Sequence, residues 1–182
     1  MKNQHVIMVV GPDMTGKSQI AKELAMRLGN SRFYFKASTE HDSFLSSKTT
    51  KREAFLNQLR YADPRVFDVL KQTGHSIVFD RAFPCEAAYS EVMQRETDHT
   101  MLTHMDEMWA SIDARIVFCH RNSYEGITDD LDPSIDSAML QRIHDAYVKF
   151  LSASKCKVLK LNVDDENLDR EVSEILEFLK VK

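Results

Sequence analysis

The chain has 182 residues, of which 43% are hydrophobic and 29% are charged, and its formal net charge at pH 7 is −4. This length and this balance fit one globular domain with a buried core. The slightly acidic charge gives no general attraction to nucleic acid or to anionic membranes, so a small-molecule substrate is favoured over DNA, which is not excluded.

The cysteines and the apolar runs bear on where the protein works. Cys85, Cys119 and Cys156 are scattered along the chain. Their odd number argues against a disulfide framework, and their spacing fits no metal site. The apolar runs are far too short to span a membrane, and the first residues show no signal-peptide pattern. We therefore expect a soluble, uncleaved protein of the cytoplasm with no membrane partner.

The predicted elements begin with a buried strand and a loop of distinctive composition. Val6 to Val10 is a continuous apolar run, as in a parallel strand covered on both faces. The loop GPDMTGKS then contains the complete pattern G-x-x-x-x-G-K-[ST] at Gly11, Gly16, Lys17 and Ser18. Apolar residues at helical spacing follow it. The motif therefore lies between a strand and a helix.

That placement predicts a nucleoside triphosphate site. Backbone N–H groups of the loop and the positive end of the helix would surround the phosphates. Lys17 would reach the outer phosphates, and the Ser18 hydroxyl would bind Mg²⁺. The candidate residues for binding ATP are Gly11, Asp13, Met14, Thr15, Gly16, Lys17, Ser18 and Gln19. The alternative interpretation is a glycine-rich turn with an exposed lysine.

The rest of the chain alternates short apolar runs with helical periods. Further strands are predicted at residues 32–36, 76–80, 115–119 and 158–162. Helices are predicted at residues 51–61, 64–73, 85–97, 101–112, 137–153 and 167–180. This alternation predicts an α/β fold in which a five-stranded parallel sheet carries helices on both faces. Ligands should bind beyond the carboxyl ends of the strands, where the phosphate loop lies.

A second polar cluster follows the strand at residues 76–80. Asp80 ends this strand and Arg81 follows it, at the same edge of the sheet as the phosphate loop. An aspartate there can hold Mg²⁺ through water or accept a proton from an attacking hydroxyl, and an arginine can bind a phosphate with two parallel hydrogen bonds. The pair predicts phosphoryl transfer. The alternative is a surface Asp–Arg pair that closes the strand.

With both motifs in view, the sequence resembles the thymidylate kinase group of nucleoside monophosphate kinases. The loop of that family usually reads G-x-D-G-x-G-K-[ST], and here Asp13 is in place while Met14 stands where glycine is usual. The segment DRAFPCEAAYS, which begins at Asp80, matches the family pattern D-R-Y-x-x-S-x-x-A-Y-Q at its Asp, Arg, Ala and Tyr. The segment QRIHDAYVKFL looks like the helix after the family's lid. The departures from the second motif are Ala82, Cys85 and Ser90.

The resemblance implies a single P-loop kinase domain over residues 1–182 and a role for several side chains. Asp80 and Arg81 would lie at the transferring phosphate, with Arg81 holding the phosphate of the acceptor. Tyr89 would pack under the acceptor sugar, and Arg60 stands where the family places an acceptor-binding arginine. Phe83 would be either a stacking surface for the base or part of the core. The departures at the acceptor side put thymine specificity in doubt.

The family also folds a short mobile lid, here at about residues 120–136. The segment contains one arginine, Arg121, among several acidic residues. Because the phosphate loop offers no arginine, Arg121 is the candidate cation that neutralises charge in the transition state. Gly126 would be the hinge. The alternative is a solvated acidic loop with Arg121 as a strand-end residue.

Together these features predict Mg²⁺-dependent transfer of the ATP γ-phosphate to a nucleotide, most simply a pyrimidine deoxynucleoside monophosphate such as dTMP or a modified analogue. The predicted catalytic residues are Lys17, Asp80, Arg81 and Arg121; the acceptor-binding residues are Arg60, Arg81, Phe83 and Tyr89; the metal-binding residues are Ser18 and Asp80. The alternatives are a kinase of a nucleoside or of a hydroxymethylated base in DNA, and an ATP-binding regulatory module. The resemblance also allows a homodimer.

Overall fold

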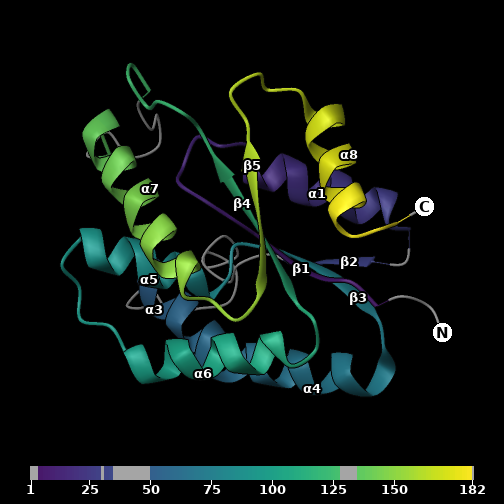
Figure 1. Cartoon of the computed structure of the whole chain (residues 1–182). Helices are drawn as coiled ribbons and strands as arrows, with labels where there is room; N and C mark the ends of the chain where they lie inside the picture. The colour runs from purple at the N-terminus through teal and green to yellow at the C-terminus, as the bar shows by residue number, and fades with distance from the viewer. Residues whose placement is uncertain (1–3, 30, 35–49, 128–134, 182) are drawn as a thin grey trace.

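A five-stranded parallel sheet forms the centre of the structure, a computed structural model that describes residues 4–29, 31–34, 50–127 and 135–181. The strand order is β2-β3-β1-β4-β5 (Figure 1). All neighbouring strands are parallel, so their carboxyl ends share one edge. The strands are β1 (Val6–Val10), β2 (Ser31–Tyr34), β3 (Ser76–Asp80), β4 (Arg115–His120) and β5 (Lys157–Asn162). The predicted α/β architecture is confirmed.

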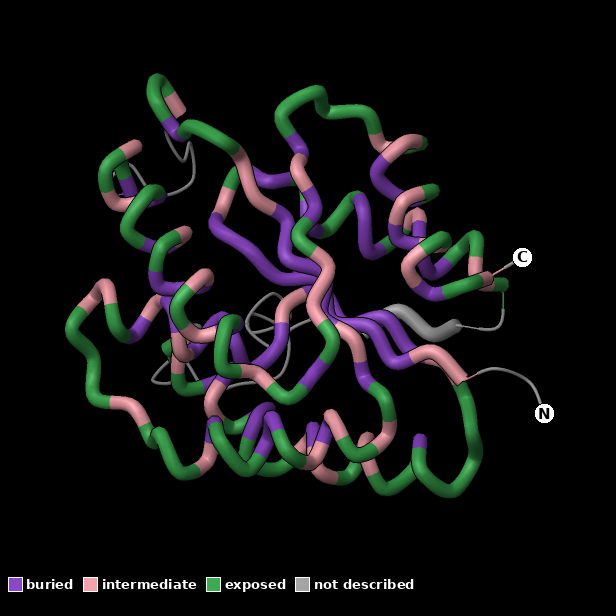
Figure 2. Tube along the Cα trace, viewed as in Figure 1, coloured by how far each residue is buried: buried purple, intermediate pink, exposed green. Residues whose placement is uncertain are grey.

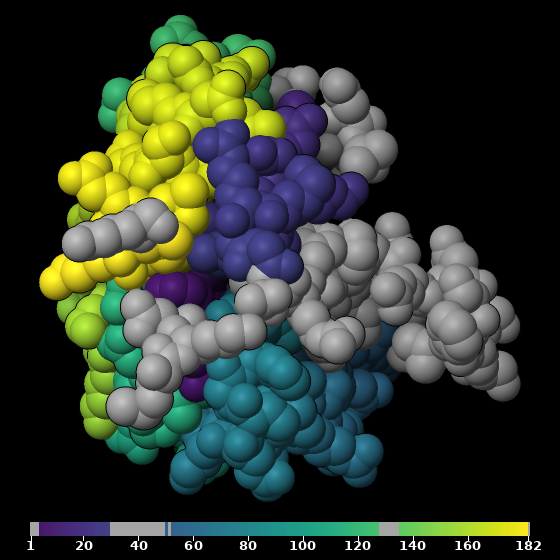
Figure 3. Space-filling model, turned by 90° about the vertical axis from the view of Figure 1, so that its right-hand side faces the viewer, coloured from purple at the N-terminus to yellow at the C-terminus, as the bar shows by residue number. Residues whose placement is uncertain are grey.

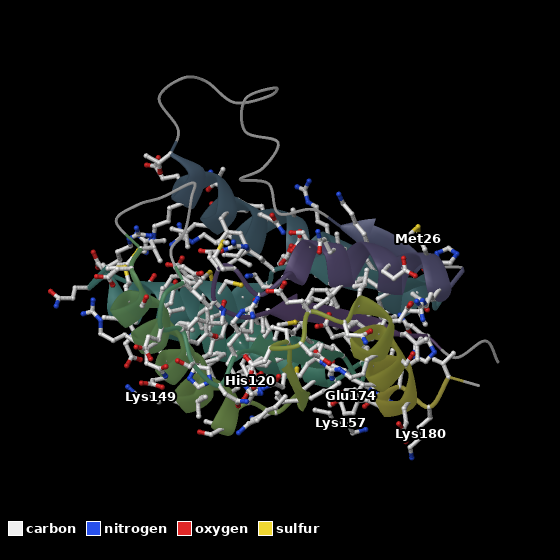
Figure 4. All side chains as sticks on the ribbon, turned by 90° about the horizontal axis from the view of Figure 1, so that it is seen from above. Met26, His120, Lys149, Lys157, Glu174 and Lys180 are labelled. Atoms are coloured by element: carbon white, nitrogen blue, oxygen red, sulfur yellow. The ribbon has the colours of Figure 1, made fainter. Side chains whose placement is uncertain are left out.

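Helices cover both faces of this sheet. One layer consists of α1 (Lys17–Arg27) and α8 (Leu168–Phe178), which lie side by side in Figure 3. The other layer consists of α3 (Lys51–Asn57), α4 (Asp63–Thr73), α5 (Phe83–Val92), α6 (His99–Ala110) and α7 (Ser137–Ser152). Figure 4 shows the separation from above, with Met26 of α1 and Lys149 of α7 on opposite sides of the view. No helix in the described ranges is long and apolar enough to cross a bilayer.

Alternate residues of the strands supply two separate cores. In β1, Met8 and Val10 contribute to the core shared with the layer of five helices, whereas Ile7 and Val9 pack with α1 and α8. The whole strand is buried, as the purple centre of Figure 2 shows. Because both faces are covered, the sequence of this strand is continuously apolar instead of alternating.

The region predicted as two helices, at residues 51–61 and 64–73, is one continuous helical stretch, so the predicted break is wrong. A π-helical turn, η2 (Gln58–Ala62), joins α3 directly to α4, and the Asp63 N–H donates to the Gln58 carbonyl oxygen. Pro64 lies in the first turn of α4. The wider turn accommodates this proline, whose ring would clash with the preceding turn of an ordinary α-helix.

Other boundaries differ from the predictions by a few residues. The helix predicted at residues 85–97 is α5, which begins earlier, at Phe83, and ends at Val92. Gln94 takes a positive φ of 52° just after it, which an α-helix does not continue through. Asp98 then caps α6, its carboxylate accepting from the Met101 N–H at 2.9 Å. Residues 35–36 of the second predicted strand and 128–134 of the predicted lid lie outside the described residues.

Candidate functional site

The loop between β1 and α1 lies beside a pocket of about 630 Å³. Figure 1 shows the chain passing from β1 into α1 at the end of the sheet to which the arrows of β4 and β5 point. At Gly11, φ is 147° and a Cβ would overlap the backbone carbonyl oxygen of Cys119 in the adjacent strand β4. The close approach of these two strands therefore requires glycine as the first residue of the loop.

Met14 occupies the position where the family usually has glycine, and the backbone explains the preference. Its φ is 62°, in the left-handed region that glycine adopts without strain, and Gly16 has a similar φ of 68°. The Met14 side chain is 42% exposed. The loop thus keeps the glycine-like conformation although the residue is methionine.

The pocket gathers residues from separate parts of the chain. All of the predicted ATP-binding residues line it except Gly11, whose role is to let β1 and β4 approach. Arg81 and Arg121 line it from the ends of β3 and β4. Sequence reasoning missed the wall that follows β5, which consists of Val163, Glu166, Leu168 and Glu171. The rule that ligands bind at the carboxyl edge of a parallel sheet is the signal that could have found this wall.

Lys17 is a buried cation in this pocket, with 5% of its surface exposed. Its ammonium group donates to the Pro12 carbonyl oxygen and, at 3.4 Å, to the Thr15 hydroxyl. Burial lowers the pKa of Lys17, the positive charge of Arg81 lowers it further, and Asp13 opposes both. A cation held without full hydration gains strongly from a bound anion, so this arrangement suits phosphate.

Ser18 and Asp80 bring the start of α1 to the end of β3. The Ser18 hydroxyl donates to Asp80 Oδ2 at 2.7 Å. Asp80 is 5% exposed, and its Oδ1 is buried without a hydrogen-bond partner. Mg²⁺ prefers oxygen ligands and is usually held by one or two carboxylates together with water and substrate phosphates. The described residues contain no cluster of three or more His, Cys, Asp or Glu side chains suited to a metal. The Ser18–Asp80 pair therefore fits a Mg²⁺ ion shared with phosphates.

Asp13 joins the phosphate loop to the second motif. Its Oδ1 pairs with the Arg81 guanidinium, and its Oδ2 accepts from the Tyr89 hydroxyl at 2.6 Å. The Tyr89 oxygen also accepts from the Asp13 N–H at 3.1 Å. Burial alone would raise the pKa of Asp13, but the charges of Arg81 and Lys17 and the hydrogen bonds from Tyr89 and Arg81 lower it to about 2. Asp13 is thus an anion at neutral pH and fixes Arg81 at the pocket.

Of the four predicted acceptor-binding residues, Arg81 lines this pocket, Tyr89 reaches it through its hydrogen bond to Asp13, and Phe83 and Arg60 do neither. Phe83 is fully buried and its ring meets the Phe150 ring edge to face at 6.0 Å, so the base-stacking interpretation is wrong and the core alternative holds. Arg60 lies on η2, is exposed, and does not line the phosphate pocket. Its predicted contact with an acceptor stays a prediction, as does the packing of Tyr89 under a sugar.

Arg121 links the phosphate loop to the wall after β5. Its Nε donates to the Met14 carbonyl oxygen at 3.1 Å, and a terminal nitrogen donates to Glu166 at 2.7 Å. The Arg121 side chain is 14% exposed. The structure thus places the predicted lid cation directly against the phosphate loop. Its role in catalysis stays a prediction.

Comparisons with known proteins add the fold relationship. No protein-family model and no curated protein sequence matches the chain. Among solved structures, thymidylate kinase from Candida albicans aligns with a TM-score of 0.65 and 18% identity over 98% of this chain and 92% of its own. Thymidylate kinase from Ehrlichia chaffeensis aligns with a TM-score of 0.66 and 13% identity over 97% of this chain and 99% of its own.

A third similar structure is the YorR protein from Bacillus subtilis, solved in complex with phosphorylated GDP. It aligns with a TM-score of 0.67 and 16% identity over 97% of this chain and 96% of its own. These three alignments each span nearly the whole of both chains, so they include the sheet and both helical layers. The chain therefore has the fold of these thymidylate kinase structures, as the resemblance of its two motifs predicted.

Proposed function

We propose that the protein is a Mg-ATP-dependent phosphotransferase that phosphorylates a nucleoside monophosphate. The observation that carries the proposal is that Lys17, Ser18 and Arg81 line one pocket beside the phosphate loop, while Asp80 is hydrogen-bonded to Ser18 behind it. These groups come from two distant segments of the chain. They combine a buried cation, a site suited to Mg²⁺ and a second cation, which are the parts that phosphoryl transfer needs.

The chain's own groups would act by positioning and by charge. The loop N–H groups and Lys17 would stabilise the negative charge of the transferring phosphoryl group. Bound Mg²⁺ would neutralise charge on the phosphates. Ser18 would hold the ion directly and Asp80 would hold it through water. Arg81, fixed by Asp13, would orient the phosphate of the acceptor, and Arg121 would add charge from the other side.

We further propose that the acceptor is a deoxynucleoside monophosphate, with a pyrimidine such as dTMP or a modified analogue as the first choice. The support is the match of the second motif at Asp80, Arg81, Ala88 and Tyr89, together with the shared fold. The residues that depart from the family motif, Ala82 and Cys85, are both buried, at 1% and 4% exposed.

The cysteines support a location in the cytoplasm as part of this proposal. All three are free and buried, in keeping with work in a reducing compartment.

The test is ADP release from Mg-ATP while single acceptors are offered in turn: each deoxynucleoside monophosphate, each ribonucleotide, free nucleosides and single-stranded DNA. We expect one monophosphate to stimulate release strongly. Stimulation by a nucleoside or by DNA instead would show a different kinase. Tight Mg-ATP binding without stimulation by any acceptor would show a regulatory module and contradict the proposal.

Two variants connect the assay to the geometry. Lys17→Met should lower the rate by roughly 10²–10³-fold or more, because a preorganised charge at the transferring group is lost. Lys160→Met, which changes an exposed lysine of β5, should leave the rate unchanged. Arg81→Ala should abolish stimulation by the acceptor, while Arg95→Ala, at an exposed arginine, should preserve it. Equal rates for Lys17→Met and Lys160→Met would contradict the assigned role of the loop.

A further inference from the structure

Glu171, near the start of α8, is a buried acid for which the proposed transfer has no use. It is 4% exposed and lines the same pocket as the phosphate loop. Its Oε1 is buried and has no hydrogen-bond partner. A buried carboxylate without a hydrogen-bond donor is costly, so an acid of this kind beside a ligand pocket is suited to accept a hydrogen bond from a ligand.

The adjacent cation does not satisfy this carboxylate. A terminal nitrogen of Arg170 lies 3.8 Å from Glu171 Oε1, which is too long for a hydrogen bond. The Arg170 guanidinium instead donates to both carboxylate oxygens of Asp165, to the Asn162 carbonyl oxygen and to Glu174. Burial is the main cause that raises the pKa of Glu171, as expected for an acid left without a donor.

The surroundings of Glu171 fit the base of a nucleotide. Ile20, Val163 and Leu168 provide apolar side chains in the same pocket, to which Lys17 and the loop contribute the phosphate-binding groups. A purine nucleotide has the complementary layout, because its flat apolar ring carries N–H donors on one edge. Pockets of this kind combine apolar walls with a few polar groups that fix the orientation and the identity of the ligand.

We propose that Glu171 selects the base of the donor nucleotide by accepting a hydrogen bond from an N–H group on the six-membered ring of a purine. This inference rests on the proposed function, since it concerns the triphosphate that donates the phosphoryl group. Adenine offers its exocyclic N6 amino group, and guanine offers N1–H with the N2 amino group. A purine that lacks these donors leaves the Glu171 carboxylate without a hydrogen-bond donor and binds less tightly.

The experiment compares three triphosphates by equilibrium binding to the full chain: ATP, GTP and purine riboside triphosphate, whose six-membered ring carries no N–H donor. We expect the tighter of ATP and GTP to bind roughly 10- to 100-fold more tightly than purine riboside triphosphate, because a hydrogen bond to a buried carboxyl group is lost. Which of the two binds more tightly identifies the donor that Glu171 accepts.

A variant pair ties this preference to Glu171. Glu171→Met removes the hydrogen-bond acceptor but keeps an unbranched side chain. The affinity for the tighter of ATP and GTP, divided by the affinity for purine riboside triphosphate, should therefore fall to about one. Glu177→Met, at an exposed position of the same helix that does not line the pocket, should keep the wild-type ratio. Equal ratios in Glu171→Met and the wild type would overturn the inference.

The possible failures are distinguishable. If wild-type protein binds all three triphosphates equally and still phosphorylates an acceptor, the assignment of Glu171 fails while the proposed function stands. If no triphosphate binds, both fail. If Glu171→Met does not fold, equal binding of the three triphosphates by wild-type protein still overturns the assignment.

Discussion

On the phosphate-loop side of the site, the predicted ATP-binding side chains line one pocket. On the acceptor side, two of the predicted acceptor-binding side chains are instead buried in the core or exposed to solvent. Lys17, Ser18 and Asp80 meet at the loop, but Phe83 lies in the core and Arg60 is exposed on η2. The loop is determined by backbone geometry, which a few glycines and small residues specify. The acceptor side depends on how whole side chains pack, which a short motif specifies poorly.

The largest expected effect tests this contrast at Phe83. Phe83→Ala should lower the free energy of unfolding by about 3–5 kcal/mol, because a fully buried aromatic ring is removed. Urea unfolding followed by circular dichroism measures it. The milder Phe83→Leu should leave the KM for the acceptor near its wild-type value. A large rise of that KM with little loss of stability would return Phe83 to the acceptor site.

On the phosphate-loop side, stability should depend on backbone geometry. Gly11→Ala should lower the free energy of unfolding by about 2–3 kcal/mol, because the added methyl group overlaps the Cys119 carbonyl oxygen and the strands must move. Gly74→Ala is the matched control: its φ is also positive, at 64°, but a Cβ there meets no atom within 4 Å. It should cost only about 1 kcal/mol. Equal losses of stability in the two variants would show that β1 and β4 are not tightly apposed.

Two buried aspartates, Asp13 and Asp63, should make the stability of the fold change with pH in opposite directions. Asp13, on the loop side, has a pKa lowered to about 2, so it contributes stability above about pH 4 that is lost as the pH falls toward 2. Asp63, at the start of α4, is 1% exposed. Burial raises its pKa to about 7, although a hydrogen bond from Gln58 opposes the shift. The folded state therefore keeps a proton that the unfolded state releases, and stability falls as the pH rises from about 4 to about 7.

Asp63→Asn isolates that second effect, because the amide is neutral and of nearly the same size. Relative to wild type, the variant should gain roughly 1–2 kcal/mol of stability between pH 5 and pH 7. Asp68→Asn, an exposed neighbour on α4, serves as control. Urea midpoints measured across this pH range decide the question, and parallel pH profiles for Asp63→Asn and wild type would contradict the prediction.

The smallest expected effect concerns Met14. Glycine would relieve the left-handed backbone conformation, but it would also increase the freedom of the unfolded chain. Met14→Gly should therefore change the free energy of unfolding by less than about 1 kcal/mol, most simply as a gain. Met26→Gly, at an exposed position in the last turn of α1, should instead lower stability by up to about 1 kcal/mol. A loss of equal size in both variants would show that Met14 is not strained.

Much of the fold could be predicted because its signals are local. The bounds of β1 and β3 match the predicted runs, since both strands are buried on both faces and end at polar or glycine residues. The continuation of α3 through η2 into α4 could not be predicted, because Pro64 ordinarily marks a helix start and nothing local signals a π-helical turn. The position of Phe83 was likewise undecided, since an aromatic residue in an apolar helix fits a core and a binding surface equally well.

The wall after β5 shows a further limit. Residues 163–167 resemble an ordinary polar turn, and Glu171 lies beside Val172 in a helix whose apolar residues fit a core-facing stripe. Glu171 becomes part of the site only because α8 packs next to α1, which brings this residue to the phosphate pocket. Such long-range proximity, between the first helix of the chain and the last, leaves no spacing in the sequence that could be read as a motif.

The π-helical turn has a consequence for changes in the length of this segment. The Asp63 N–H bonds to the Gln58 carbonyl oxygen five residues back, so this turn holds one residue more than an α-helical turn. A one-residue deletion within Gln58–Ala62 would allow ordinary α-helical bonds to close, and buried Leu70 could still face the same core. The same deletion in the middle of α4 would instead turn the rest of that helix by about 100°. The π-helical segment should therefore tolerate the loss of one residue better than its neighbours do, at the cost of a tighter fit around Pro64.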